Sequence, residues 1–389
     1  MPRLISGALR VIVCLLLALV MSLPARVIAQ ESDSLIASST LSDVQRGPTP
    51  DEPIAELWRF DGSSYRSLQP PLVTDDLAIT VGDNDEQRTI IALDKRTGAL
   101  VWQRPMSEES LDTFAIADDL VFLRTDDGSL QALAVRDGEE AWTSDVTIGE
   151  SPQDIVTDGE RVVVTDGDRI VAVEAGSGDT IWDARPFPGG EISIVALANS
   201  ALFAVAGSSG EGVAALDVAT GAELWRHERP GGSLAAQGTA IDAVFVTRYD
   251  DEPSGQGWIA LDARSGAPLW ESPMDDSASF AVASADTVYA CGNDGVVALD
   301  VLTGSSVWSK PGACSGMSVT DDAVTVASGD PDDHILASLS LAGEARWSFD
   351  IPGAFDEISG FTVDDGVIHV GTTSRSDHGC PGTRRPQRP

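Results

Sequence analysis

Acidic clusters are the first candidates for chemistry in this chain of 389 residues. They lie at residues 83–86 (Asp-Asn-Asp-Glu), 126–128 (Asp-Asp-Gly), 166–168 (Asp-Gly-Asp) and 330–333 (Asp-Pro-Asp-Asp). Carboxylate oxygens are good calcium ligands, but none of the clusters has the ligand order of an EF-hand loop. Asp, Asn and Gly also build the tight turns between strands. We therefore interpret the clusters as solvated turns and predict no metal-binding residue.

The histidines and the known catalytic signatures give no second candidate. His227, His334, His369 and His378 show none of the spacings that zinc sites use. The sequence contains neither Gly-x-Ser-x-Gly nor His-Glu-x-x-His, the motifs of serine hydrolases and zinc proteases. We predict no catalytic residue, and the sequence does not support a hydrolase.

The charge of the chain excludes one class of partner. The formal net charge is −36, and Lys95 and Lys310 are the only lysines. A surface this acidic repels the phosphate backbone, so nucleic acid is not an expected partner.

The first 29 residues have the order of a secretory signal peptide. Arg3 and Arg10 precede the apolar run Val11–Leu23, and Val27-Ile28-Ala29 offers a site of short side chains. The run has 13 residues, fewer than the roughly 20 that a membrane-spanning helix needs. We predict cleavage after Ala29, an extracytoplasmic location (secreted or in the cell envelope) and no stable membrane span after cleavage.

The rest of the chain divides into three segments. Residues 30–53 are rich in Ser, Thr, Asp and Pro, so we predict a disordered linker. Residues 54–374 carry an internal repeat, which predicts one closed domain, and residues 375–389 form a basic, irregular tail.

The repeat is defined by a glycine four residues before a tryptophan. The pairs are Gly98 with Trp102, Gly138 with Trp142, Gly178 with Trp182, Gly221 with Trp225, Gly266 with Trp270, Gly304 with Trp308 and Gly343 with Trp347. Trp58 lacks the glycine, and successive tryptophans from Trp58 to Trp347 are 38 to 45 residues apart. A period of this length indicates a repeat architecture.

Short β-rich runs alternate with turn residues throughout the repeat. Examples are Ala78–Val81, Leu120–Leu123, Val162–Val164, Val244–Val246 and Val288–Ala290. No segment shows a long helical period. We predict an all-β fold in which four antiparallel strands make one propeller blade. The last repeat supplies strands at Ile358–Val363 and Val367–Thr372, but no Ala-Leu-Asp strand follows them.

The repeated residues have structural roles. Glycine permits the positive φ of a tight turn between the third and fourth strands. Tryptophan is large and mostly apolar and has one N–H to satisfy, which suits packing between blades. The residue eight positions before Trp is acidic in five repeats: Asp94, Glu174, Asp217, Asp262 and Asp300; in two it is Ala134 and Leu339. We interpret this acid as a turn cap, because catalysis needs one placed group and not five equivalent ones.

The motif Ala-Leu-Asp-x-x-Thr-Gly-x-x-x-Trp, as at residues 298–308, resembles the repeat of the pyrroloquinoline-quinone-like β-propellers, which include quinoprotein dehydrogenases and outer-membrane assembly proteins. The resemblance implies eight four-stranded blades, with an N-terminal strand containing Trp58 completing the last blade.

The resemblance also raises the alternative of a quinone-dependent oxidoreductase. Such enzymes hold their cofactor with adjacent cysteines, a stacked tryptophan and calcium. This chain has no adjacent cysteines, and Trp258, the one tryptophan outside the repeat, is interpreted as packing or loop cover. We predict no cofactor; pyrroloquinoline quinone with calcium stays the alternative.

Two further predictions complete the interpretation. We predict a disulfide between Cys291 and Cys314, because the end of a second strand and the start of the next blade's first strand lie on one face of the ring, and export permits oxidation. We predict a monomeric, non-catalytic scaffold that binds a protein or a cell-envelope component. A small-ligand sensor that uses the central funnel is a further alternative.

Overall fold

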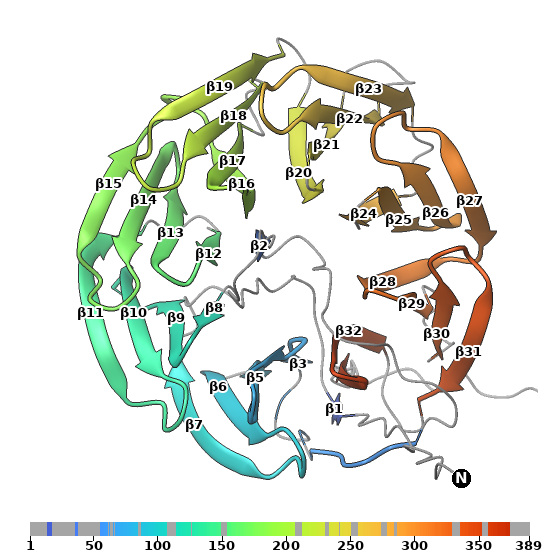
Figure 1. Ribbon diagram of the computed structural model, residues 1–389. Coiled ribbons are helices and arrows are strands. Elements are labelled where there is room, and N and C mark those ends of the chain that lie inside the picture. The colour runs from blue at the N-terminus through green and yellow to red at the C-terminus, as the bar shows by residue number, and fades with distance from the viewer. Residues whose placement is uncertain are drawn as a thin grey trace, which may run out of the picture.

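The computed structural model describes residues 14–17, 36–37, 55–60, 62, 65, 67–84, 87–106, 114–125, 127–148, 154–206, 212–229, 233–240, 242–249, 256–273, 278–283, 286–328, 335–351 and 357–373. Strands and turns make up these residues, and none of them is in a helix. The strands form a ring of radial sheets (Figure 1). The predicted all-β propeller is therefore confirmed.

Seven blades each contain four antiparallel strands. The first four blades are β4 (Leu72–Val73), β5 (Leu77–Asn84), β6 (Gln87–Asp94) and β7 (Leu100–Met106); β8 (Phe114–Ala117), β9 (Leu120–Arg124), β10 (Ser129–Ala134) and β11 (Glu140–Thr147); β12 (Ile155–Thr157), β13 (Arg161–Asp166), β14 (Arg169–Glu174) and β15 (Thr180–Ala184); β16 (Ile192–Ala198), β17 (Ala201–Ala206), β18 (Gly212–Asp217) and β19 (Glu223–Glu228).

The remaining three follow the same order. They are β20 (Ser233–Ala240), β21 (Ala243–Tyr249), β22 (Gln256–Asp262) and β23 (Pro268–Pro273); β24 (Ala278–Ala283), β25 (Thr287–Gly292), β26 (Gly295–Asp300) and β27 (Ser306–Pro311); β28 (Cys314–Val319), β29 (Ala323–Ser328), β30 (Ile335–Ser340) and β31 (Ala345–Asp350). In each blade the first strand lies nearest the centre of the ring and the fourth lies at its rim (Figure 1).

The second strand of each blade is buried on both sides, because each blade is covered by a neighbour on both faces. Each β-rich run singled out in the sequence falls in such a strand: β5, β9, β13, β21 and β25. In β13 Val162, Val163 and Val164 are all fully buried. This continuous apolar pattern is the reason that these strands stood out in the sequence.

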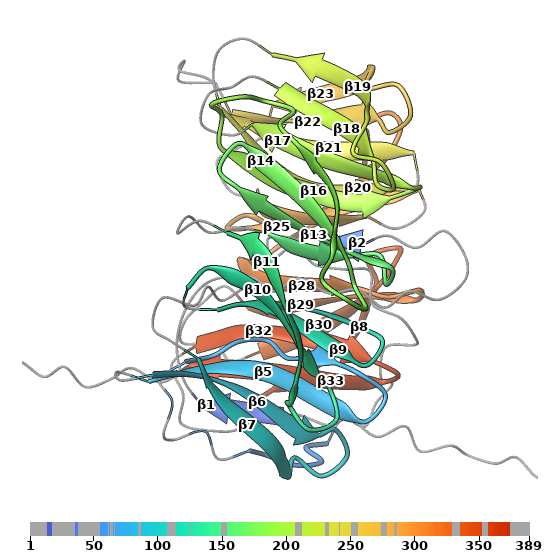
Figure 2. The ribbon, with the colours of Figure 1, turned by 90° about the vertical axis from the view of Figure 1, so that its left-hand side faces the viewer.

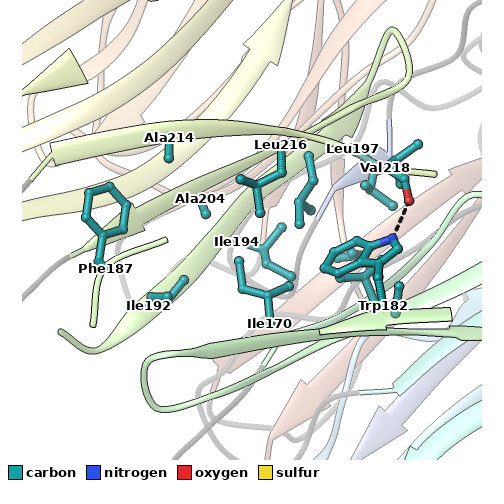
Figure 3. Packing of buried hydrophobic residues seen from close by; sticks show 14 of the residues in the cluster. Ile170, Trp182, Phe187, Ile192, Ile194, Leu197, Ala204, Ala214, Leu216 and Val218 are labelled. Atoms are coloured by element: carbon teal, nitrogen blue, oxygen red, sulfur yellow. Dashed lines mark hydrogen bonds between the residues drawn. The ribbon is translucent and has the colours of Figure 1, made fainter. Parts of the chain in front are cut away.

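The core consists of separate apolar layers between neighbouring blades. One layer joins Ile170 and Trp182 of blade three to Ile194 and Leu216 of blade four (Figure 3). The side view shows the twisted sheets stacked one on the next (Figure 2). Stability therefore depends on each blade meeting the next, and the two ends of the chain must close the ring.

The closing position holds a pair of antiparallel strands. β32 (Glu357–Asp364) pairs antiparallel with β33 (Val367–Thr373), which confirms the two strands predicted in the last repeat. β3 (Ser67–Leu68) pairs with both β5 and β33, so this pair and blade one form one continuous sheet. β1 (Cys14–Leu17) pairs in parallel with β33, and β2 (Ile36–Ala37) pairs with the inner edge of β16.

The prediction of eight four-stranded blades closed by the Trp58 strand is wrong. The described residues form seven four-stranded blades, and residues 55–60 are not in a strand. Among the described residues no third strand follows β33 in the chain, so side-chain contacts of Trp58 and not backbone pairing hold the Trp58 segment in place.

Side chains complete the closure. The hydroxyls of Thr362 and Ser359 donate hydrogen bonds to the carbonyls of Pro71 and Leu68 at 2.8 and 2.9 Å. Lys95 Nζ lies 2.8 Å from Asp364 Oδ2. These three contacts join residues that are 269 to 291 positions apart in sequence, so they hold the C-terminal pair against blade one.

Candidate functional site

The repeated Trp and Gly form a lock between blades, and the partners come from neighbouring repeats. Each indole Nε1–H donates to a carbonyl in the next blade at 2.7 to 3.0 Å. The pairs are Trp58 with Lys95, Trp102 with Val135, Trp142 with Ala175, Trp182 with Val218, Trp225 with Ala263, Trp270 with Val301 and Trp308 with Leu341. Figure 3 shows the bond from Trp182.

The indole ring lies on the turn glycine of that next blade. The pairs are Trp58 on Gly98, Trp102 on Gly138, Trp142 on Gly178, Trp182 on Gly221, Trp225 on Gly266, Trp270 on Gly304 and Trp308 on Gly343. A Cβ on any of these glycines would lie within 2.7 Å of a ring carbon, and their φ angles are +67° to +81°. The eighth tryptophan of the repeat, Trp347, is buried in the layer between blade seven and the C-terminal pair. Glycine is thus required both by the turn and by the ring.

The turn acids cap their own turns. Asp300 Oδ1 accepts hydrogen bonds from the backbone N–H of Thr303 at 2.8 Å and from its hydroxyl at 2.8 Å. The hydroxyl of Thr303 lowers the pKa of Asp300 below its ordinary value. Asp94, Asp217 and Asp262 make the same bonds with Thr97, Thr220 and Ser265. The interpretation as turn caps is therefore confirmed for these residues.

One position of the acid pattern needs correction. Counting back from Trp347 selects Leu339, but the turn of blade seven is one residue shorter. Gly343 N–H donates to Ser340 O, and the Ser340 hydroxyl accepts from Glu344 N–H at 3.1 Å. Ser340 therefore takes the place of the acid in this blade.

The acidic clusters fall at turns where they are described. Asp83 lies 3.9 Å from Arg88 across a hairpin. Asp168 bonds the Arg185 guanidinium and accepts from Gly189 N–H at 2.8 Å. The cluster at 330–333 and the residues His334 and His378 lie outside the described residues. Among the residues that are described, no three His, Cys, Asp or Glu side chains group closely enough to hold a metal ion.

The side chains of Cys291, Cys314 and Trp258 are buried. The structure joins Cys291 at the end of β25 to Cys314 at the start of β28 as a disulfide, with Cα atoms 5.8 Å apart. Trp258 is fully buried between blades five and six, 6.4 Å from the ring of Phe245. Trp258 is therefore a packing residue, and its indole is not available to stack on a cofactor.

A pocket of about 470 Å³ lies between blades one and two. Its apolar floor comes from Ile90, Met106, Leu123 and Leu133, which belong to the layer between these blades. Its lining includes Thr125 and Asp127 of the turn between β9 and β10.

Polar groups surround the pocket floor. Arg104 Nη1 donates to Gly138 O at 2.8 Å, and Arg124 Nε donates to Ile148 O at 3.2 Å. Asp127 accepts a hydrogen bond from the Thr125 hydroxyl, which lowers the pKa of Asp127 below its ordinary value. Gln131 Nε2 donates to Thr143 Oγ1 at 3.1 Å. Two cations, one anion and an amide above an apolar floor suit binding of a mixed polar and apolar segment.

The pocket lacks the parts of a catalytic site. Its lining includes neither a Ser or Cys paired with a base nor two acids at a working distance. Sequence reasoning missed Arg104, Arg124, Gln131 and Thr143, because they come from different repeats and share no motif. One weak signal exists: Arg104 stands two residues after Trp102, where Ser144 of the next repeat makes the equivalent bond to Gly178 O at 2.7 Å.

Within the residues that are described, no helix has the length and apolar character to cross a membrane.

Comparisons with known proteins agree with the repeat. A curated relative, the outer membrane protein assembly factor BamB of Moranella endobia, is 25% identical over 197 residues, which are 44% of this chain and 50% of the relative. The chain thus matches about half the length of that relative.

Three solved structures share the fold. BamB from Moraxella catarrhalis is 20% identical, covers 69% of this chain and 84% of its own, and gives a TM-score of 0.53. A computationally designed protein is 16% identical with 82% and 96% coverage and a TM-score of 0.62. The quinohemoprotein alcohol dehydrogenase of Comamonas testosteroni is 13% identical with 78% and 70% coverage and a TM-score of 0.52.

The family itself is given by the sequence match. The family model described as outer membrane protein assembly factor BamB matches residues 54–158, 147–348 and 255–372, which include all seven four-stranded blades. The chain therefore belongs to this family of pyrroloquinoline-quinone-like β-propellers.

Proposed function

We propose that the protein is an extracytoplasmic scaffold of the cell envelope and that it binds a segment of a partner protein in the pocket between blades one and two. The observation that carries the proposal is the pocket itself: its apolar floor is bordered by the guanidinium groups of Arg104 and Arg124. Membership of the BamB family and the name of the Moranella endobia relative support a role in outer-membrane protein assembly.

The charge distribution favours a protein segment as the occupant. The chain as a whole carries −36, yet the pocket holds two arginines and one aspartate. A segment that places an apolar side chain on the floor and a carboxylate or carbonyl beside the guanidiniums would satisfy both kinds of group. Rigid walls favour such binding, because the blades on either side are fixed by the Trp102 lock.

The test is site-specific photo-crosslinking in the native envelope. A photoreactive residue at Gln131 should capture a partner, and Arg104→Met in the same chain should reduce the yield at least about tenfold by removing one guanidinium. Met keeps the length of the apolar stem, so the wall of the pocket is retained.

A matched control is Ser144→Ala. Ser144 donates to Gly178 O as Arg104 donates to Gly138 O, but it does not line the pocket. The control variant should crosslink like the unmodified chain. Equal yields from Arg104→Met and the unmodified chain would show that the pocket is not the binding site.

A further inference from the structure

In several blades an aromatic ring of the second strand lies close to the Trp ring of the fourth strand, across the third strand. In blades two, four, five and six, a ring of the second strand lies 5.8 to 6.0 Å from the Trp of the fourth strand. The pairs are Phe122 with Trp142, Phe203 with Trp225, Phe245 with Trp270 and Tyr289 with Trp308. In each case an alanine of the third strand is cross-strand partner to both rings: Ala132, Ala215, Ala260 and Ala298.

The closing position shows the same spacing. The ring of His369 in β33 lies 6.2 Å from the ring of Trp58. His369 takes the place of the second-strand aromatic, and Trp58 makes the fourth-strand contacts to Lys95 O and Gly98. Trp58 therefore stands where a fourth strand would stand, and the place of one third strand lies between it and β33.

The segment that occupies this place differs from all other third strands. β1 pairs with β33 with Cys14 opposite His369, and the two strands are parallel. The third strand of every four-stranded blade is antiparallel to its second strand. β1 also lies within residues 1–29, which the sequence predicts to be removed on export.

We propose that removal of the leader opens the outer edge of β33 and that this edge accepts an extended segment of a partner protein as the missing third strand. The inference deepens the proposed scaffold function and rests on it. An open strand edge presents unpaired N–H and C=O groups, so it favours addition of a strand from another chain.

The neighbouring side chains define the sequence that the edge accepts. A small residue must lie opposite His369, because 6.2 Å between the two rings leaves the space that alanine fills in four other blades. A turn that contains glycine should follow this strand. In each lock the Trp of one blade lies on the turn glycine of the next blade, and Trp347 of blade seven would lie on the glycine of this turn. The expected partner segment is thus an alternating small-apolar strand that ends in a Gly turn.

The probe is a synthetic peptide with the sequence of residues 295–306, the third strand and turn of blade six. A fluorescent label on the peptide should report saturable binding to the exported chain, whose mass establishes that residues 1–29 are absent. Binding to the full chain that retains the leader should be at least about tenfold weaker, because β1 occupies the edge.

Two peptide variants test the geometry without altering the fold of the protein. Val297→Pro removes a ladder N–H, and Ala298→Phe places a large ring opposite His369. Each should weaken binding at least about tenfold. Bound parent peptide should slow hydrogen exchange of those amides within residues 367–372 that point away from β32.

Three results would overturn the proposal: no saturable binding, equal binding of all three peptides, or slow exchange, in the exported chain alone, of the β33 amides that point away from β32. The last result would mean that a segment of the chain itself fills the edge. If the peptide does not bind but Arg104→Met still loses crosslinking, the strand site is rejected and the scaffold function remains supported.

Discussion

At the scale of single residues, the repeated Asp, Trp and Gly have structural roles. The Asp of a turn accepts hydrogen bonds within its own turn, and the Trp of one blade covers the Gly of the next. Arg104, Arg124 and Gln131, which line the pocket proposed to bind a partner, recur in no motif.

The turn glycines should be intolerant of a side chain. Gly304→Ala would force a residue with a Cβ to φ +67° and push that Cβ into the Trp270 ring. We expect a loss of stability of about 2 kcal/mol or more, measured by chemical unfolding.

Gly176→Ala is the matched control. Gly176 also lies in a turn between third and fourth strands, but a Cβ there meets no atom within 4 Å and its φ is not positive. The control should unfold like the unmodified chain. Equal losses for both variants would show that the ring contact is not the cause.

The turn acids predict a pH dependence. Hydrogen bonds from Thr97, Ser265 and Thr303 lower the pKa of Asp94, Asp262 and Asp300 below the ordinary 3.8. A carboxyl group whose pKa is lower in the folded than in the unfolded state stabilises the fold at pH values above its unfolded pKa. This stabilisation is lost as the pH falls through the folded pKa. The melting temperature should therefore decrease as the pH is lowered below about 4.

The variant with Asn at these three positions isolates this contribution. It should lose less melting temperature between pH 5 and pH 3 than the unmodified chain does, because Asn does not titrate. An identical pH profile for the two proteins would contradict the assignment.

At the scale of strands and blades, the contacts that join neighbouring blades are few in kind and repeated around the ring. Backbone pairing holds each blade together, whereas the Trp locks and the apolar layers hold blades to each other. The Cys291–Cys314 bond adds a covalent link between β25 of blade six and β28 of blade seven.

The disulfide should contribute to stability in the exported protein. The bond closes a segment of 23 residues, for which chain entropy predicts about 3 kcal/mol. Reductant should lower the melting temperature of the unmodified protein and leave that of the Cys291→Ala, Cys314→Ala double variant unchanged. Alkylation of both thiols in native, unreduced protein would show that the bond does not form.

Trp58 should matter as much as a tryptophan inside the ring. It makes the same bond and the same glycine contact as Trp182, although it is not in a strand. We expect Trp58→Ala, like deletion of residues 56–60, to destabilise the fold by about 3 to 5 kcal/mol, the cost of removing a buried aromatic ring.

Trp182→Ala and Trp58→Phe are the comparison variants for Trp58→Ala. Trp182→Ala should cost about the same as Trp58→Ala, and Trp58→Phe should cost less, because the ring remains on Gly98. Unchanged melting of Trp58→Ala would mean that this contact does not close the ring.

At the scale of the whole molecule, the protein is a strongly acidic ring of blades that is closed by an incomplete sheet, and we expect this joint to be the weakest in the ring. Seven blades are complete, and the closing pair is held by β3, Trp58 and side-chain bonds. A rigid frame with unequal loops suits presentation of binding surfaces.

The scaffold interpretation predicts that the protein does not oxidise alcohols or sugars. The chain lacks adjacent cysteines, and Trp258, the tryptophan outside the repeat, is fully buried in packing. We expect incubation with pyrroloquinoline quinone and calcium to give no dye reduction with a panel of alcohols and sugars. Turnover that disappears when calcium is chelated would replace the scaffold function by a dehydrogenase.

The sequence by itself determined the blade. The Gly–Trp spacing, the buried second strands and the turn acids are local properties, because each depends on residues within one repeat of 38 to 45 residues. Such short-range signals are readable without knowing what lies across the ring. The same reasoning placed Cys291 and Cys314 on one face.

Only the tertiary structure decided how repeats meet. It showed that Trp102 lies on Gly138 and not on the Gly98 of its own repeat, and that the described part of the chain forms seven four-stranded blades with an antiparallel pair at the joint. It also brought Arg104 and Arg124 to one pocket. These are contacts between residues distant in the chain, fixed by the angle and curvature of packed sheets, and no residue pattern within one repeat contains them.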